Sequence, residues 1–358
     1  MMAAFYRRFG HAAALLLGAF LTVGCSPPPS GDGKTVILSY NVQNIFDAEH
    51  DGSEYDEFIP GRRWSEELYH LRLHGLSEVI RNTTPPPDVV LLQEVEDRGV
   101  LEDLCTVYLP EYGYSQRITG GPEESATQVG LLTHLPVVEV RRHAPPVHDH
   151  PLRNILEVSL LIGRNELILL GNHWKSRAGG DEGESNPGGE LRIQTARMVR
   201  LRLEDIFSER PRAKVILAGD FNSEPAGGTA DFAPPLVLTE SPGNGGVGGA
   251  ENVPVTERTD TAVFEVGSSE SAVIPFFSPW GLEEAGGSYR YRGSWERIDA
   301  FYLSPSLLAP PGPLFEQFMV HPWKELRSRE GEPLRWIQEL QSGYSDHLPL
   351  ILTLDNED

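Results

Sequence analysis

The sequence predicts an α/β fold, or α+β by some schemes, because short strand-like runs and helical patterns alternate along the whole chain. Runs rich in β-branched and aliphatic residues, each flanked by turn-forming residues, predict eight strands. These runs are Thr35–Tyr40, Asp88–Leu92, Val129–Leu132, Leu156–Ile162, Leu167–Leu170, Lys214–Ala218, Asp299–Leu303 and Leu350–Leu354. Apolar residues at helical spacing predict helices over 68–80 and 191–206. Runs that are apolar on both faces, such as Val89–Leu92, predict sheets covered by helices.

The length and charge of the chain restrict its class. With 358 residues and 39% hydrophobic content, it can bury a sizeable core in one large domain or two smaller ones. A formal net charge of -22 repels polyanions at long range, which counts against a DNA-binding protein with a broad basic face. A nuclease with a local basic cleft remains compatible, since metal ions supply positive charge at the site itself.

The N-terminal segment has the features of a processed leader. Arg7 and Arg8 precede an apolar stretch, Ala12–Val23, that is short for a membrane span, so we expect a signal peptide over residues 1–24. Leu21–Cys25 resembles a lipoprotein processing box and predicts a lipid on Cys25, with a flexible tether over residues 25–34. This anchor would place the protein in the cell envelope, at the outer membrane or cell surface. The alternative is an ordinary signal peptide, which would give a secreted protein.

Two further segments have structural explanations. Cys105 lies among apolar residues at helical spacing, and with Cys25 lipidated it has no cysteine partner. We expect it to be a buried structural thiol. Residues 226–253 are rich in glycine and proline, which predicts a long surface loop, either a substrate lid or a tolerated insertion.

Polar residues of catalytic type stand at the ends of the predicted strands. In four runs these polar residues come directly after the strand. In two other runs they come directly before the strand or are its first residue. If the last two strands run antiparallel to the first four, all six groups reach one rim of the sheets, as a single active site requires. The residues are Asn41, Glu94, His173, Asp220 with Asn222, Asp299, and Asp346 with His347.

The residue types indicate phosphoester chemistry. Glu94 is a plausible hard ligand for Mg²⁺. Asp220 and Asn222 would share one face of an extended segment, where the acid binds water or a metal and the amide donates to a phosphate. His173 can donate to a phosphate oxygen or protonate a leaving group.

The C-terminal acids fit different tasks. Asp299 can fix the tautomer of His347, so that the imidazole can activate water. Asp346, which adjoins His347, is better placed for a metal. Each acid alone would have an ordinary ion-pair or capping role.

This ordered set resembles the endonuclease/exonuclease/phosphatase superfamily, which contains deoxyribonuclease I, apurinic endonucleases, neutral sphingomyelinases and inositol polyphosphate 5-phosphatases. The similarity spans residues 35–354 and predicts one domain over 35–358. It implies a four-layer sandwich of two mixed β-sheets flanked by helices, with the site at one edge. The matching motifs are Ser39-Tyr40-Asn41, Leu92-Gln93-Glu94, Asn172-His173, Gly219-Asp220-Phe221-Asn222, Ile298-Asp299 and Ser345-Asp346-His347.

The resemblance also implies roles. It places Mg²⁺, or Mn²⁺ or Ca²⁺, near Asn41, Glu94 and Asp346. It places His173 and Asn222 on the phosphate and lets Asp299 orient His347, while either Asp220 or the His347 pair activates water. Some relatives carry an Asp where this chain has Gln43, so the number of metal ions stays open.

The sequence is compatible with several substrates. Lys175, Arg177 and Arg192 are candidate phosphate contacts, and Tyr289, Tyr291 and Trp295 either stack on a base or sugar or pack in the core. A bacterial secreted branch described as nuclease-like has similar motifs, which here are Asn44-Ile45-Phe46-Asp47, Asp56-Glu57-Phe58, Trp64 and His173-Trp174-Lys175-Ser176. We therefore expect a metal-dependent nuclease that acts on nucleic acid. The alternatives are a phosphodiesterase or phosphatase on a sphingomyelin-like lipid or small phosphorylated metabolite, and an inactive surface binding lipoprotein.

Overall fold

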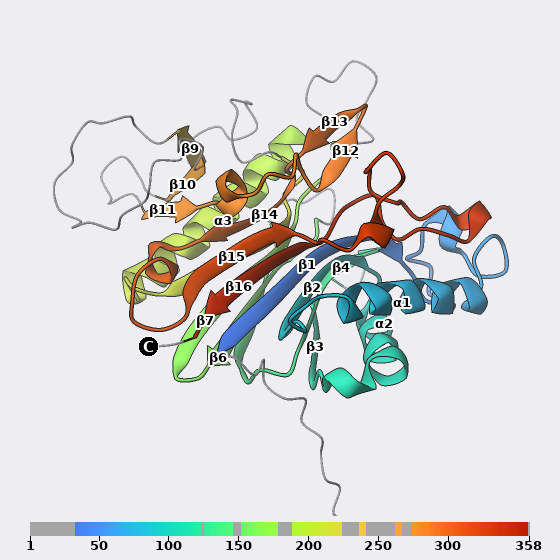
Figure 1. Cartoon of the computed structure of the whole chain (residues 1–358), viewed down its shortest axis with the longest axis horizontal. Helices are drawn as coiled ribbons and strands as arrows, with labels where there is room; N and C mark the ends of the chain where they lie inside the picture. Colours follow the sequence, from blue (N-terminus) through green and yellow to red (C-terminus); the bar gives the residue numbers. More distant parts are fainter. Residues whose placement is uncertain are drawn as a thin grey trace, which may run out of the picture.

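The computed structural model describes residues 33–122, 125–145, 152–177, 188–223, 236–240, 262–266 and 274–356. Within these ranges the strands form two large sheets and a two-stranded hairpin (Figure 1). The predicted signal peptide, the lipid on Cys25 and nearly all of the tether lie outside the described residues. No helix in the described ranges is both long enough and apolar enough to cross a membrane.

The first sheet has six strands in the order β15-β16-β1-β2-β4-β3. Strands β1 and β2 are parallel, and every other neighbouring pair is antiparallel. The strands are β1 (Lys34–Ile45), β2 (Val89–Val95), β3 (Gln116–Thr119), β4 (Gln128–Thr133), β15 (Leu314–Val320) and β16 (Leu350–Asp355).

The second sheet has eight strands in the order β5-β6-β7-β8-β14-β11-β10-β9. Only β7 and β8 are parallel neighbours. The strands are β5 (Val137–His143), β6 (Ile155–Ile162), β7 (Asn165–His173), β8 (Lys214–Asp220), β9 (Leu236–Glu240), β10 (Ala262–Val266), β11 (Ile274–Phe277) and β14 (Asp299–Leu303). The separate hairpin consists of β12 (Tyr289–Tyr291) and β13 (Ser294–Glu296).

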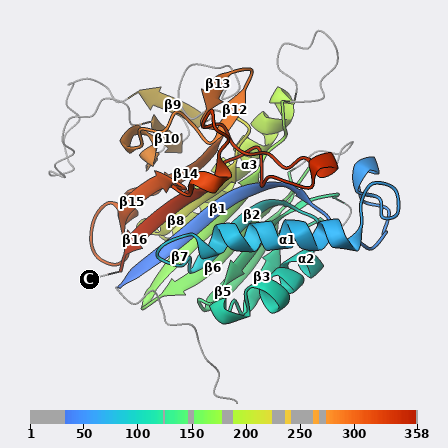
Figure 2. The same cartoon turned by 45° about the vertical axis from the view of Figure 1, so that its right-hand side comes forward.

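Helices cover the outer faces of both sheets (Figure 2). Helix α1 (Glu66–Arg81) and helix α2 (Arg98–Asp103), which continues as a π-helix over Leu104–Tyr108, lie on the six-stranded sheet. Helix α3 (Gly189–Glu209) lies on the eight-stranded sheet, where Arg202 pairs with Glu157 of β6 at 2.7 Å. Ser65 caps α1 by accepting a hydrogen bond from the Leu68 amide, a contact worth about 1 kcal/mol.

The two sheets pack against each other through apolar side chains. A Cβ atom on Gly171 of β7 would lie 2.7 Å from the Leu91 side chain of β2, so glycine permits this close approach. The layers are therefore helix, sheet, sheet and helix, which confirms the predicted four-layer sandwich of two mixed sheets.

All eight predicted strands are present, and β14 and β16 run antiparallel to their neighbours β8 and β1, as the convergence of the site requires. The edge strand β5 has no apolar alternation and escaped prediction. The expectation of an irregular loop over 226–253 is wrong at Leu236–Glu240, which forms β9, and the rest of that segment lies outside the described residues. Cys105 is buried and forms no disulfide in the described residues, as expected.

Candidate active site

The predicted groups meet at one rim of the sheets, where they surround a cavity of ≈ 1250 Å³ that we term the active-site cavity. Asn41 and Asp299 are buried directly behind its lining. The predicted residues that line it are Glu94, His173, Arg177, Asp220, Asn222, Asp346 and His347.

Asn41 links two of the acids. Its Nδ2 atom lies 3.2 Å from Oε1 of Glu94 and 3.0 Å from Oδ2 of Asp220. Its Oδ1 atom accepts a hydrogen bond from the Gln43 amide at 3.0 Å. Asn41 therefore fixes the spacing of the two carboxylates, and one lone pair of its oxygen is already occupied.

Glu94 leaves its strand through an unusual backbone conformation. Its φ is +69°, which is uncommon for a residue with a Cβ atom, and the pairing of β2 with β4 shifts register between Gln93 and Val95. The Oε2 atom of Glu94 accepts a hydrogen bond from the Asn44 amide at 2.9 Å. The bulge thus turns this carboxylate toward the cavity, where 18% of its side chain is exposed.

Asp220 and Asn222 form a tight turn instead of the extended segment that the sequence suggested. The Asn222 amide donates to Oδ1 of Asp220 at 2.8 Å, and Asn222 has a φ of +50°. Both side chains still reach the cavity. The preceding Gly219 has a φ of +126°, and a Cβ atom there would lie 2.0 Å from the Asn172 carbonyl oxygen. Burial, reinforced by Asp299, raises the pKa of Asp220 to about 7.

His347 is held from behind by Asp299. Its Nδ1 atom lies 2.7 Å from Oδ2 of Asp299, which also accepts a hydrogen bond from Ser288 at 2.5 Å. The Tyr289 ring packs at 4.7 Å from the imidazole. Burial opposes the charged form of His347, but Asp299 and other acids outweigh it and raise its pKa to about 10. The structure therefore contains the Asp299–His347 pair that the resemblance implied.

His173 lies beside two of the acids. Its Nε2 atom is 3.5 Å from Oε1 of Glu94 and 3.8 Å from Oδ2 of Asp220. Burial, aided by nearby cations such as Arg153, holds the pKa of His173 well below its usual range. A neutral His173 can donate one hydrogen bond toward the cavity.

The predicted cations divide into three cases. Arg177 lines the cavity and pairs with Glu296. Lys175 is exposed and lies outside the lining. Arg192 also lies outside the lining, since its side chain is 1% exposed and donates to the Lys175 carbonyl oxygen at 3.0 Å, and its contact with a phosphate stays a prediction. Arg192 supports the backbone behind the site.

Sequence reasoning missed four arginines that line the same cavity: Arg63, Arg153, Arg292 and Arg335. None of them follows a buried strand run, so the rule that identified the acids could not identify them. The hairpin β12–β13 also contributes, because Tyr289 and Tyr291 line the cavity while Trp295 packs against the core.

The donor set suits a divalent cation. Ligand atoms of Asp220, Asp299 and His347 lie within 4.8 Å of one another, and Glu94 and Asp346 line the same cavity. Carboxylate oxygens are the ligands that hard divalent cations prefer, and burial together with the neighbouring Asp299 raises the pKa of Asp220, so a cation at this site would stabilise its charged form. The residues present therefore fit a bound metal ion.

The chain belongs to the endonuclease/exonuclease/phosphatase family, whose family model matches residues 36–231. Membership makes it a metal-dependent phosphoesterase. A search of the curated proteins finds no match.

Solved structures agree with this fold. A humanized D. rerio TDP2 carrying 14 mutations is 18% identical, covers 91% of this chain and 100% of its own, and has a TM-score of 0.54. A truncated Caenorhabditis elegans TDP2 is 16% identical over 90% of this chain and 97% of its own, with a TM-score of 0.50. A functionally unknown conserved protein from Enterococcus faecalis is 13% identical over 90% of this chain and 100% of its own, with a TM-score of 0.50. At these identities the likeness shows the fold alone.

Proposed function

We propose that this phosphoesterase is a nuclease that cleaves phosphodiester bonds in nucleic acid. The observation that carries the proposal is the concentration of arginine around the active-site cavity of a chain with a net charge of -22. Guanidinium groups bind phosphate oxygens in bidentate fashion, and several along one cavity suit a substrate with successive phosphates. The five arginines are Arg63, Arg153, Arg177, Arg292 and Arg335.

A second feature favours a nucleotide over a lipid. Tyr291 is 48% exposed at the hairpin tip, and the Arg292 guanidinium lies 5.2 Å from its ring centroid. Exposed aromatic rings beside arginine are typical platforms for stacked bases. A sphingomyelin-like lipid or a phosphorylated sugar alcohol has no base to stack there.

The residues divide the chemistry among them. Glu94 and Asp346 would hold the cation, and we propose Mg²⁺ because the donors are oxygens. When bound, the cation supplies Lewis acidity and polarises the phosphoryl oxygens. Asp220, with a pKa of about 7, accepts the proton of the attacking water, or the Asp299–His347 pair does so once His347, with its pKa of about 10, has lost its own proton.

Hydrogen-bond donors then stabilise the added charge. His173 and Asn222 reach the cavity from the ends of β7 and β8, which are rigid buried strands. Donors fixed before the reaction stabilise developing charge more effectively than water, because they need not reorient.

A panel of metals and substrates tests the proposal on the chain that begins at Gly31. We expect Mg²⁺- or Mn²⁺-dependent cleavage of DNA or RNA that EDTA abolishes. Hydrolysis of sphingomyelin vesicles or small phosphomonoesters without nucleic acid cleavage would favour the lipid or metabolite alternative. Absence of all hydrolysis would favour the inactive binding lipoprotein.

We further propose that the enzyme is exported and anchored at the outer membrane or cell surface by a lipid on Cys25. The support is the processing-box sequence Leu21–Cys25 after the apolar stretch. A Cys25→Ser variant should move from the membrane fraction to the soluble fraction in the producing cell. An unchanged distribution would leave the secreted alternative.

A further inference from the structure

Helix α1 carries an arginine, Arg72, whose side chain enters the protein instead of the solvent. Arg72 is 4% exposed, and no carboxylate of the described residues forms an ion pair with it. Burial lowers the pKa of Arg72 to about 10, so the guanidinium stays charged at neutral pH. A buried charge that no carboxylate contacts directly is costly and needs several aligned dipoles to compensate it.

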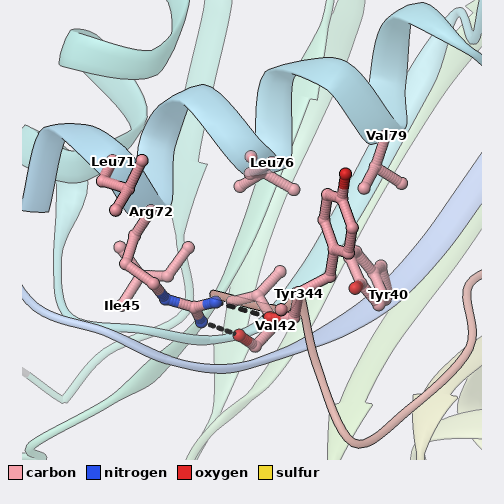
Figure 3. A pocket seen from close by; sticks show the side chains of 10 residues that line it. Tyr40, Val42, Ile45, Leu71, Arg72, Leu76, Val79 and Tyr344 are labelled. Carbon is pink, nitrogen blue, oxygen red and sulfur yellow. Dashed lines mark hydrogen bonds between the residues drawn. The ribbon is translucent and has the colours of Figure 1, made fainter. Parts of the chain in front are cut away.

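Backbone carbonyl groups of two distant segments supply those dipoles (Figure 3). On one side, Nη2 of Arg72 donates to the carbonyl oxygens of Val42 and Gln43, the latter at 3.0 Å. On the other side, Nη1 donates to the Tyr344 carbonyl oxygen at 2.5 Å. The planar guanidinium has several N–H donors in fixed directions, so it can form hydrogen bonds with both segments at once. A lysine ammonium group cannot do so in the same geometry.

The first segment is a strained bend in β1. Gln43 and Asn44 have φ values of +53° and +55°, and β1 loses its regular pairing with β2 between Asn41 and Ile45. Residues with a Cβ atom hold such conformations only where surrounding contacts enforce them. The bend turns the Asn44 amide toward Oε2 of Glu94, 2.9 Å away. The guanidinium therefore stabilises a backbone conformation on which the position of Glu94 depends.

The second segment leads into the C-terminal motif. Tyr344 precedes Ser345, whose Oγ donates to the Asn41 carbonyl oxygen at 2.7 Å and accepts from the His347 amide at 3.1 Å. The same guanidinium lies 5.0 Å from the ring centroid of Trp336. Trp336 in turn exchanges two backbone hydrogen bonds with the Gln43 side chain, at 2.8 Å and 3.2 Å.

We propose that Arg72 is a positioning residue that holds the Gln43–Asn44 bend and the Tyr344–His347 segment in register. It thereby fixes the Glu94 side of the active site relative to its Asp346–His347 side. Arg72 is absent from the lining of the active-site cavity, so it acts through backbone that it orders. This role rests on the proposed phosphoesterase site.

Hydrogen exchange tests the proposal without any substrate. In Arg72→Met, the amides of Asn44 and His347 should exchange at least ~10-fold faster than in the wild type, because each depends on a segment that Arg72 orders. The matched control is Arg81→Met on the same helix, which removes contacts to Glu111 and Glu78 far from the site. It should leave both amides unchanged.

Kinetics adds a second readout. We expect Arg72→Met to lower kcat and the apparent affinity for Mg²⁺ by about 10- to 100-fold each, the range typical of groups behind metal ligands. KM for the substrate should stay within about threefold, since Arg72 makes no substrate contact. Arg81→Met should match the wild type at temperatures well below unfolding.

The outcomes separate the two proposals. A folded Arg72→Met variant with wild-type exchange, kcat and Mg²⁺ affinity would overturn the positioning role. If Arg72→Met does not fold, Arg72→Lys replaces it, and wild-type exchange at both amides in that variant would overturn the role as well. Absence of hydrolysis by the wild type would reject the proposed function alone, because exchange still reports on Arg72.

Discussion

The Nδ1 atom of His347 lies 2.7 Å from Oδ2 of Asp299, and the two residues lie at strands of different sheets. Asp299 begins β14 of the eight-stranded sheet, whereas His347 precedes β16 of the six-stranded sheet. This contact therefore joins the two halves of the sandwich at the point where the chemistry takes place.

Replacement of Asp299 by Asn should remove the charge that stabilises protonated His347 while it preserves the shape of the side chain. We expect kcat to fall by about 10²- to 10⁴-fold, as for other groups in acid–base catalysis. Phosphodiester hydrolysis should be compared with His70→Asn, a substitution on the surface of α1. Near-full activity in Asp299→Asn would contradict the orienting role.

Asp220→Asn and His347→Asn, alone and together, test which group activates water. If the two act on the same proton transfer, the double variant should be no slower than the slower single variant. Each single variant should lose about 10²- to 10⁴-fold in kcat with its fold intact by circular dichroism. Fully multiplicative losses would show that the residues act on separate steps.

Arg335→Gln should weaken binding of an oligonucleotide more than that of a small phosphodiester. Each lost phosphate contact lowers the salt dependence of log KM by roughly one unit of slope. KM should be measured over a range of salt concentrations, with Arg98→Gln on α2 as a control outside the cavity. Equal effects on both substrates would indicate that Arg335 does not contact an extended chain.

His321 should make stability depend on pH. It is fully buried, its Nδ1 accepts from the Trp323 amide at 3.1 Å, and burial lowers its pKa from 6.5 to about 4. The unfolded chain thus takes up the proton first, so stability is present above pH 6.5 and is lost as the pH falls toward 4.

The expected loss from His321 is about 3 kcal/mol across that interval. Urea unfolding at pH 7 and pH 4.5 should show most of this loss in the free energy of unfolding. A His321→Gln variant should lose less between the same two pH values. Equal losses of unfolding free energy in the two proteins would exclude His321 as the cause of the pH dependence.

Gly219→Ala should destabilise the protein far more than Gly163→Ala. Both glycines have positive φ, but only at Gly219 would a Cβ atom collide with backbone, whereas nothing lies within 4 Å at Gly163. We expect a loss of about 1 kcal/mol at Gly163 and several times more at Gly219, measured by urea unfolding. Similar losses would mean that the Asn172 backbone moves aside easily.

The sequence predicted the strand ends well because buried strands have a strong local signal. Glu94, His173 and Asp220 each follow an apolar run, and the alternation of strand direction placed Asp299 and His347 beside them. The left-handed conformations of Glu94 and Asn222 could not be predicted, since they depend on neighbours that are distant in the chain.

The cationic residues of the site were harder to predict, because their positions also depend on contacts that are distant in the chain. Arg153 and Arg335 reach the cavity only through the fold, and Gln43 meets Trp336 across 293 residues. Arg192 and Arg72 are buried on helices, where charged residues are normally exposed. No local pattern distinguishes a buried arginine from a solvated one.

Strand β16 lies inside its sheet, between β15 and β1, and it directly follows the segment that carries Asp346 and His347. Strands β1 and β16 are thus neighbours in one sheet although they are far apart in sequence. The pairing of β16 with β1 and β15 brings Asp346 and His347 to the rim at which Glu94 and Asp220 lie, so the site is complete only when this part of the sheet is fully paired.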